Sequence, residues 1–145
     1  MGIFDKILVS VDDSKYSRDA ARLAAKIAKF HGSQVKLFHV LDALLVDKLK
    51  SLSKKDKASI REELRHNAQG FLKDMESEIK KEKVSLEVLI KEGIPHEAIL
   101  TEASSWGANL IVMGKLGRRG ISHIVLGSVT ERVIEFSDIP VLVVK

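Results

Sequence analysis

Five short apolar runs alternate with longer segments of helical periodicity, and this alternation restricts the possible folds more than any other feature of the chain. The runs cover residues 7–9, 35–40, 84–90, 110–113 and 139–144. Three of them are almost continuous in valine, isoleucine and leucine, which is typical of strands buried on both faces of a parallel sheet. The pattern predicts an α/β fold, a doubly wound five-stranded parallel sheet with helices on both faces. We expect the 145 residues to form a single domain, residues 1–145.

The periodic segments between the runs predict four helices. In the first, Leu23, Ile27 and Phe30 share one face, which we expect to be the apolar one, and Gly32 should end the helix. The second is marked by apolar residues at helical spacing, namely Ile60, Leu64, Phe71, Met75 and Ile79. Residues 42–59 form the long irregular stretch, which suits either a mobile lid or a surface connection containing a short helix.

The third and fourth helices have clear start signals. Pro95 suits the first turn of the third helix, and Ile99, Ala103 and Trp106 follow on one side. Ser128 opens the fourth helix, and its spacing to Glu131 is that of a capping box. An apolar stripe of Val129, Val133 and Phe136 lies behind it.

Composition excludes several classes of function. The chain has no cysteine, so a disulfide framework, a thiolate zinc site and a cysteine nucleophile are all ruled out. The five histidines show no metal-ligand spacing. The net charge of +4 comes from nearly balanced basic and acidic residues, and aromatic residues make up only 5%, so nucleic acid is a poor candidate partner. No apolar stretch has the features of a leader or a membrane span, so we expect a cytoplasmic protein with no membrane partner.

A glycine-rich segment follows the fourth predicted strand and ends where the fourth helix begins. It contains Gly114, Gly117, Gly120 and Gly127, together with Lys115, Arg118 and Arg119. Glycines let a main chain approach phosphates closely, and the amides and dipole of a helix N-terminus attract anions. The basic side chains add donors for phosphate oxygens. The segment therefore predicts a phosphate site, unless the glycines only shape a turn and Ser128 only caps a helix.

The spacing of this segment, Gly114-x2-Gly117-x9-Gly127-Ser128, resembles the ATP-binding signature of the universal stress protein family. Residues 7–14, 37–40, 93–97, 110–114, 126–133 and 140–144 resemble other parts of the family pattern. The resemblance covers the whole chain. It implies a Rossmann-like fold of the adenine nucleotide alpha hydrolase type, and a stress-response protein that binds ATP, ADP or AMP as a nucleotide-dependent switch or store.

Carried over by position, the resemblance implies a set of nucleotide-binding residues. Adenine would meet the main chain of Val40, and Asp12 would meet the ribose or a Mg²⁺ ion. Asp12 has a second interpretation, as part of the turn in which Asp13 or Ser14 caps the first helix. The remaining candidates flank these groups or line the phosphate site, and they are Ser10, Val11, Met113, Gly114, Gly117, Arg118, Gly127, Ser128, Val129 and Thr130.

The last apolar run predicts a strand at an edge of the sheet. Residues 139–144 are apolar and carry Pro140 near their start, which suits an edge strand and, with the family resemblance, a homodimer paired through it.

No catalytic residue is assigned, because no Walker-type lysine or water-orienting group is identifiable. A slow ATPase on the same fold is the main alternative. A phosphoacceptor receiver domain is another, but it needs a third carboxylate, an aspartate phosphoacceptor, and the third strand ends Lys91-Glu92-Gly93 without one. The receiver interpretation also leaves the glycine-rich segment unexplained. No protein partner is assigned.

Overall fold

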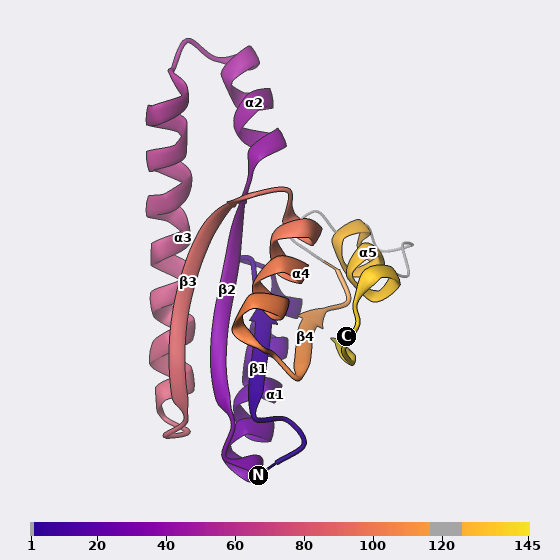
Figure 1. The fold of residues 1–145 in the computed structure, drawn as a ribbon. Coiled ribbons are helices and arrows are strands. Elements are labelled where there is room, and N and C mark those ends of the chain that lie inside the picture. The colour runs from indigo at the N-terminus through magenta and orange to yellow at the C-terminus, as the bar shows by residue number, and fades with distance from the viewer. Residues whose placement is uncertain (1, 117–125) are drawn as a thin grey trace.

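The computed structural model describes residues 2–116 and 126–145 and shows an α/β fold, as predicted (Figure 1). The strands are β1 (Lys6–Ser10), β2 (Gln34–Asp42), β3 (Ser85–Gly93), β4 (Leu110–Gly114) and β5 (Val141–Val144). The helices are α1 (Lys15–His31), α2 (Ala43–Leu52), α3 (Lys57–Lys80), α4 (Pro95–Trp106) and α5 (Ser128–Phe136). Each of the five apolar runs therefore forms a strand.

All neighbouring strands pair in parallel, in the order β3-β2-β1-β4-β5. The central strand β1 ends at Ser10, which pairs with Phe38 of β2 on one side and with Met113 of β4 on the other. From β1 the chain continues to β2 on one side, whereas from β4 it continues to β5 on the other side. The order of the strands thus reverses between β1 and β4, and ligands of doubly wound sheets bind outside the carboxyl ends of the strands at such a point.

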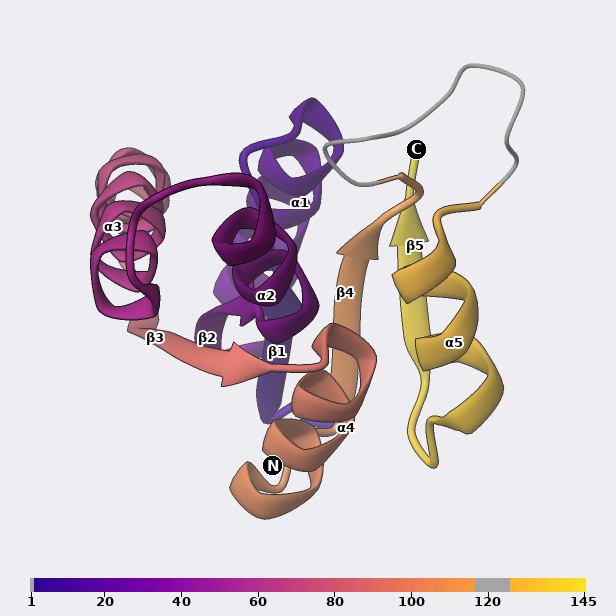
Figure 2. The same cartoon turned by 90° about the horizontal axis from the view of Figure 1, so that it is seen from above.

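Two helical layers cover the sheet, α1 and α3 on one face and α4 and α5 on the other (Figure 2). Successive side chains of β1 point to opposite faces of the sheet and so enter the cores under both helical layers. Ile7 and Val9 pack under α1 and α3, while Leu8 packs under α4 and α5. All three side chains are fully buried. Burial on both faces explains why the central strands are continuous apolar runs.

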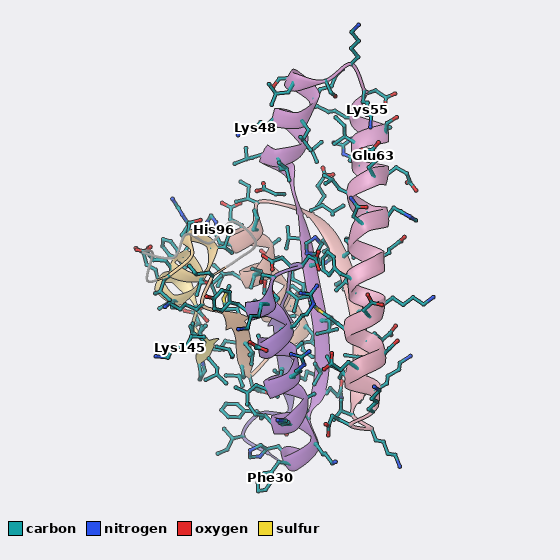
Figure 3. The ribbon with its side chains drawn as sticks, turned by 180° about the vertical axis from the view of Figure 1, so that it is seen from behind. Phe30, Lys48, Lys55, Glu63, His96 and Lys145 are labelled. Atoms are coloured by element: carbon teal, nitrogen blue, oxygen red, sulfur yellow. The ribbon has the colours of Figure 1, made fainter. Side chains whose placement is uncertain are left out.

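The expected apolar face of α1 is wrong. Leu23 is 37% exposed and Phe30 is 87% exposed, and Figure 3 shows Phe30 projecting from the lower end of the helix. A stripe of small residues faces the sheet instead, formed by Ser17, Ala20, Ala21, Ala24, Ala25 and Ala28. Helical spacing allowed both stripes. The small residues face the core because they let the helix backbone lie close to the sheet, while Ile27 packs at the margin of that core.

The other predicted helices are found with smaller differences. Gly32 ends α1 in the left-handed conformation with φ of 72°. Of the five predicted apolar residues of α3, four belong to the core beneath it, and Ile60 is buried outside that cluster. Pro95 is the first residue of α4, as predicted. In α5, Val133 is fully buried but Phe136, the last residue of the helix, is 56% exposed, so the predicted stripe is wrong at its last residue.

Residues 42–59 contain a short helix, the second of the two interpretations. Asp42 ends β2 and caps α2, because its Oδ1 accepts the amide hydrogen of Leu44 at 3.0 Å. The α2 helix and the adjoining end of α3 extend beyond the sheet (Figure 1). Lys55 and Glu63, labelled in Figure 3, form an ion pair at this end of the molecule. None of the helices in the described part of the chain is long and apolar enough to cross a bilayer.

Candidate functional site

The candidate site lies at the carboxyl ends of β1 and β4. These strands pair along their length up to Ser10 and Met113, so the segments that leave them start side by side. The segment after β1 turns into α1, and the segment after β4 leads to α5. The side chain of Met113 is buried under α4 and α5, and Ser10 is half-buried, so the two strand ends are anchored in the core.

Asp12 is held by the start of α1. Its Oδ1 accepts the amide hydrogen of Ser14 at 2.8 Å and the hydroxyl hydrogen of Ser17 at 2.9 Å. The Asp12 amide in turn donates to the Ser17 hydroxyl oxygen at 2.9 Å. These bonds place Asp12 in the turn, as its second interpretation required, and they also fix the carboxylate at the edge where a ligand role was expected.

Ser14 is the N-cap of α1. Its hydroxyl oxygen accepts the amide hydrogen of Ser17 at 3.1 Å, which confirms one of the two predicted caps. Asp13, the other candidate, forms an exposed ion pair with Arg18 instead. The Ser14 side chain therefore satisfies one amide of the first turn of α1 within the protein.

The predicted base side of the site is built from β1 and β2. The Val11 side chain is buried, its amide donates to the Phe38 carbonyl at 2.9 Å, and Nδ1 of His39 lies 2.7 Å from its carbonyl oxygen. Because a carbonyl only accepts, Nδ1 of His39 carries the proton of that bond. Alternate residues of a strand direct their main-chain groups to the same side, so Val40, like Phe38, faces the β1 side. β1 ends at Ser10, and Val40 therefore faces the space beyond it.

Gly114 ends β4 where no larger residue fits. A Cβ atom at this position would lie 2.6 Å from Cβ of Tyr16 and 2.9 Å from its carbonyl carbon. Real Cβ atoms do not approach so closely, and part of the obstruction is backbone. Glycine is therefore required for the N-terminus of α1 to close onto the end of β4.

The start of α5 differs from the prediction. Gly127 is the N-cap and Ser128 is the first helical residue, and no side-chain hydrogen bond caps the helix. The capping box expected from Ser128 and Glu131 is wrong, because the helix begins one residue too early for the Ser128 hydroxyl to reach the amides of the first turn. Ser128 is exposed and Val129 is half-buried.

This helix start is distinctive among the five helices of the described chain. Side chains of Ser14, Asp42 and Asp56 cap α1, α2 and α3. In α4, Pro95 at the first position removes one amide donor. α5 has neither a side-chain cap nor a proline. With respect to the described residues, its first-turn amides thus keep the hydrogen-bonding capacity and the positive end of the helix dipole that an anion can use.

Two hydrogen bonds fasten α5 to the end of β4. The Thr130 hydroxyl donates to the Gly114 carbonyl oxygen at 2.9 Å, and the Gly127 amide donates to the Lys115 carbonyl oxygen at 2.9 Å. The structure therefore brings together the residues predicted on either side of the glycine-rich segment. Gly117 and Arg118 lie outside the described residues, as do Arg119 and Gly120, and their roles stay predictions.

Three residues that the sequence did not single out support this site: Tyr16, which packs against Gly114, Ser17, which orients Asp12, and His39, which holds the Val11 carbonyl. His39 also packs edge-on against Phe71, with ring centroids 5.0 Å apart. The only sequence signal for Ser17 was its position three residues after the cap. Tyr16 and His39 gave none, since their partners are distant in the sequence.

Among the described residues, the buried ion pair of Lys36 and Glu102 belongs to the core and not to this edge. Lys36 and Lys91 donate to the two carboxylate oxygens of Glu102 at 2.7 and 2.9 Å, and Lys36 lies 4.5 Å from the centre of the Trp106 ring. Burial raises the pKa of Glu102, but the two lysine hydrogen bonds outweigh it, and the net pKa lies below the ordinary value. No cluster of three metal-ligating side chains occurs within residues 2–116 and 126–145, and the expected metal role of Asp12 stays a prediction.

Known proteins resemble this chain over its full length. The universal stress protein MJ0531 of Methanocaldococcus jannaschii is 35% identical, covering 99% of this chain and 83% of its own. The solved structure of a second protein of that organism, MJ0577, superposes with a TM-score of 0.87 at 30% identity, over 99% of this chain and 96% of that chain.

A third comparison carries a ligand. The universal stress protein from Archaeoglobus fulgidus in complex with dAMP superposes with a TM-score of 0.68 at 25% identity, over 99% of both chains. The sequence model of the universal stress protein family matches residues 3–145. With this match and relatives of that identity, the chain belongs to the universal stress protein family.

Proposed function

We propose that this chain binds an adenine nucleotide, ATP, ADP or AMP, at the carboxyl ends of β1 and β4. The observation that carries the proposal is the start of α5, where a glycine N-cap leaves the first-turn amides without a side-chain cap. This start is fastened to β4 beside the end of β1, at the point where the strand order reverses. Uncapped amides at a helix N-terminus favour phosphate by hydrogen bonding and by the helix dipole.

The phosphates would meet the amides of Ser128 and Val129, with the exposed Ser128 hydroxyl as a further donor. Gly127 allows close approach of the main chain, because a side chain there would occupy the space in front of the helix. Gly117 and Arg118 belong to the same proposal on the strength of the sequence alone. Their predicted contribution is a second close backbone approach and one charged donor.

The base and the ribose would lie on the β1 and β2 side. Val40 directs its main chain toward the space beyond the end of β1, where an amide and a carbonyl can pair with the edge of adenine. Asp12, oriented by Ser14 and Ser17, would accept from the ribose hydroxyls or, with phosphate oxygens, hold Mg²⁺. The dAMP complex of the Archaeoglobus relative supports an adenine nucleotide as the ligand class.

The proposed role is that of a switch or store and not of a rapid enzyme. Fast phosphoryl transfer needs charge stabilisation together with a group that orients the attacking water. Among the described groups at this edge, Ser14 and Ser17 engage the Asp12 carboxylate. Steady phosphate release at the 1–10³ s⁻¹ typical of enzymes, abolished by Ser128→Ala, would show instead that the protein is an ATPase.

Two measurements test nucleotide binding. Mass spectrometry after denaturing the purified protein identifies any nucleotide that it carries, and calorimetry gives its affinity for ATP, ADP and AMP with and without magnesium. Gly127→Val should abolish binding, and Asp12→Ala should weaken it in a folded protein. Gly70→Ala in α3, where a Cβ meets open space, is the matched glycine control. The proposal fails if none of the three nucleotides gives a heat of binding.

The family relationship and the sheet edge also support a homodimer. β5 is an edge strand of half-buried valine and leucine side chains, and Pro140 precedes it. We propose that it pairs antiparallel with the same strand of a second copy. Sedimentation should show a dimer at tens of micromolar that Val143→Lys dissociates, while Ser85→Lys on the opposite edge strand leaves it intact. A monomeric wild-type protein would contradict the proposal.

A further inference from the structure

Thr130 lies in the first turn of α5, but its hydroxyl is used outside that helix. The side chain is only 4% exposed, and Oγ1 donates to the carbonyl oxygen of Gly114 at 2.9 Å. Threonine hydroxyls inside helices commonly bond to a carbonyl three or four residues earlier in the same helix. In this chain the bond joins the start of a helix to the end of a strand sixteen residues earlier.

The Gly114 carbonyl lies where the β1–β4 ladder has ended. The following amide, of Lys115, donates to the Val144 carbonyl at 2.7 Å and thus points toward β5. Main-chain groups alternate in direction along a strand, so those of Gly114 point toward β1. The last β1–β4 pair is Ser10 with Met113. The Thr130 hydroxyl therefore supplies a donor just beyond the end of the ladder.

A second bond acts on the next residue of the same strand end. The Gly127 amide donates to the Lys115 carbonyl at 2.9 Å, and the Gly127 carbonyl accepts the Glu131 amide at 2.9 Å. The two links, through residues 114 and 115, fix both the position and the direction of the first turn of α5. That direction sets where the amides of Ser128 and Val129 point.

On this geometry, and resting on the proposed nucleotide site, we propose that Thr130 is a positioning residue for phosphate. Its buried hydroxyl holds the helix start against β4, so that the amides of Ser128 and Val129 are already oriented before the ligand binds. Hydrogen bonds weaken steeply with misalignment, and amides that are already oriented bind an anion without an ordering cost. The Thr130 hydroxyl thus acts through Gly114 and α5.

Valine is nearly the same shape as threonine but lacks the hydroxyl, so Thr130→Val removes the bond while filling the same space. Calorimetry with ATP, at a temperature where circular dichroism shows each variant folded, should give an affinity roughly tenfold lower for Thr130→Val. Thr130→Ser keeps the hydroxyl and should stay within about threefold of the wild type. Thr101→Val, at an exposed threonine of α4, is the matched control and should bind as the wild type does.

Hydrogen exchange of the Ser128 and Val129 amides gives a readout that does not need the nucleotide. Their exchange without ligand should be faster in Thr130→Val than in Thr130→Ser. If Thr130→Val does not fold, Thr130→Ala takes its place in both measurements.

The outcomes separate the two proposals. A wild-type protein that binds no nucleotide contradicts the proposed function, whereas the exchange rates still test the positioning of α5. Unchanged ATP affinity in a Thr130→Val protein that merely unfolds at a lower temperature would show a structural role only. Loss of affinity in Thr130→Ser equal to that in Thr130→Val would also overturn the proposal, because the hydroxyl would then not be the determining group.

Discussion

The starts of α1 and α5 lie at the ends of adjacent strands, yet a side chain caps the first and not the second. At α1, Ser14 caps the helix and Asp12 accepts from the Ser14 amide and the Ser17 hydroxyl. At α5, Gly127 caps the helix with no side chain, and Thr130 turns its hydroxyl to β4. One start has a side-chain cap, and the other has none among the described residues.

This difference shows that two helix starts of similar sequence character can have different roles. Both have serine at or next to the N-cap, and both follow a buried parallel strand. What separates them is a shift of one residue in where the helix begins. A serine at the N-cap stabilises the helix, whereas a serine at the first helical position is free to face a ligand.

Gly114→Ala should have the largest effect on the junction of the two starts. The added Cβ would lie 2.6 Å from Cβ of Tyr16 and also close to the Tyr16 backbone, so α1 must shift away from β4. We expect a loss of about 3 kcal/mol or more in the free energy of unfolding, measured by urea denaturation. Nucleotide affinity should fall with it, since both helix starts move.

The matched control for that prediction is Gly70→Ala. Gly70 lies within α3, and a Cβ there meets nothing within 4 Å. Alanine should stabilise the protein by about 0.5–1 kcal/mol, because glycine is unfavourable inside a helix. Equal stability of the Gly114 and Gly70 variants would mean that α1 and β4 are not in the close contact described.

Ser14→Ala and Ser128→Ala should separate the two starts directly. Ser14→Ala removes a cap and should cost about 1 kcal/mol of unfolding free energy with little direct effect on phosphate binding. Ser128→Ala removes no cap and should change that free energy by less than about 0.5 kcal/mol. It should instead weaken ATP binding by roughly three- to tenfold. Thermal melts and calorimetry check both effects. If Ser128→Ala lowered the stability and Ser14→Ala lowered the ATP affinity, the contrast between the helix starts would be wrong.

Glu131→Gln should give the smallest effect. Glu131 is the acidic residue in the first turn of α5, whereas the first turn of α1 contains none. Its charge stabilises the positive end of the helix by about 0.3–1 kcal/mol, and the variant should lose that amount. ATP affinity should rise by roughly two- to threefold at low salt, because one negative charge near the phosphates is removed. An affinity independent of this charge would place the phosphates elsewhere.

Much of the fold could be predicted because the relevant signals are local. Apolar runs, Gly32 and Pro95 each act on a few neighbouring residues, and all were found where expected. The face of α1 could not be predicted in this way. Leu23, Ile27 and Phe30 are spaced as well as the alanines are, and only the close approach of α1 to the sheet selects the smaller side chains.

The receiver alternative also depended on tertiary structure. A phosphoacceptor on the third strand would have to adjoin Asp12, but β3 is an edge strand and β2 lies between it and β1. Glu92 near its end pairs with Arg61 of α3 instead. Strand order is not specified by any local pattern, so the sequence disfavoured this alternative only indirectly, by the absence of an aspartate at the end of the third strand and by the glycine-rich segment that a receiver leaves unexplained.

By itself, the sequence determined the alternation of strands and helices and placed glycines between β4 and α5, because periodicity and backbone freedom are properties of short segments. Only the tertiary structure decided that Gly127, and not Ser128, caps α5, that Thr130 bonds to Gly114, and that Tyr16 closes onto Gly114. These choices join residues far apart in the chain. They depend on how closely two helices and a strand pack, and packing is set by the whole core.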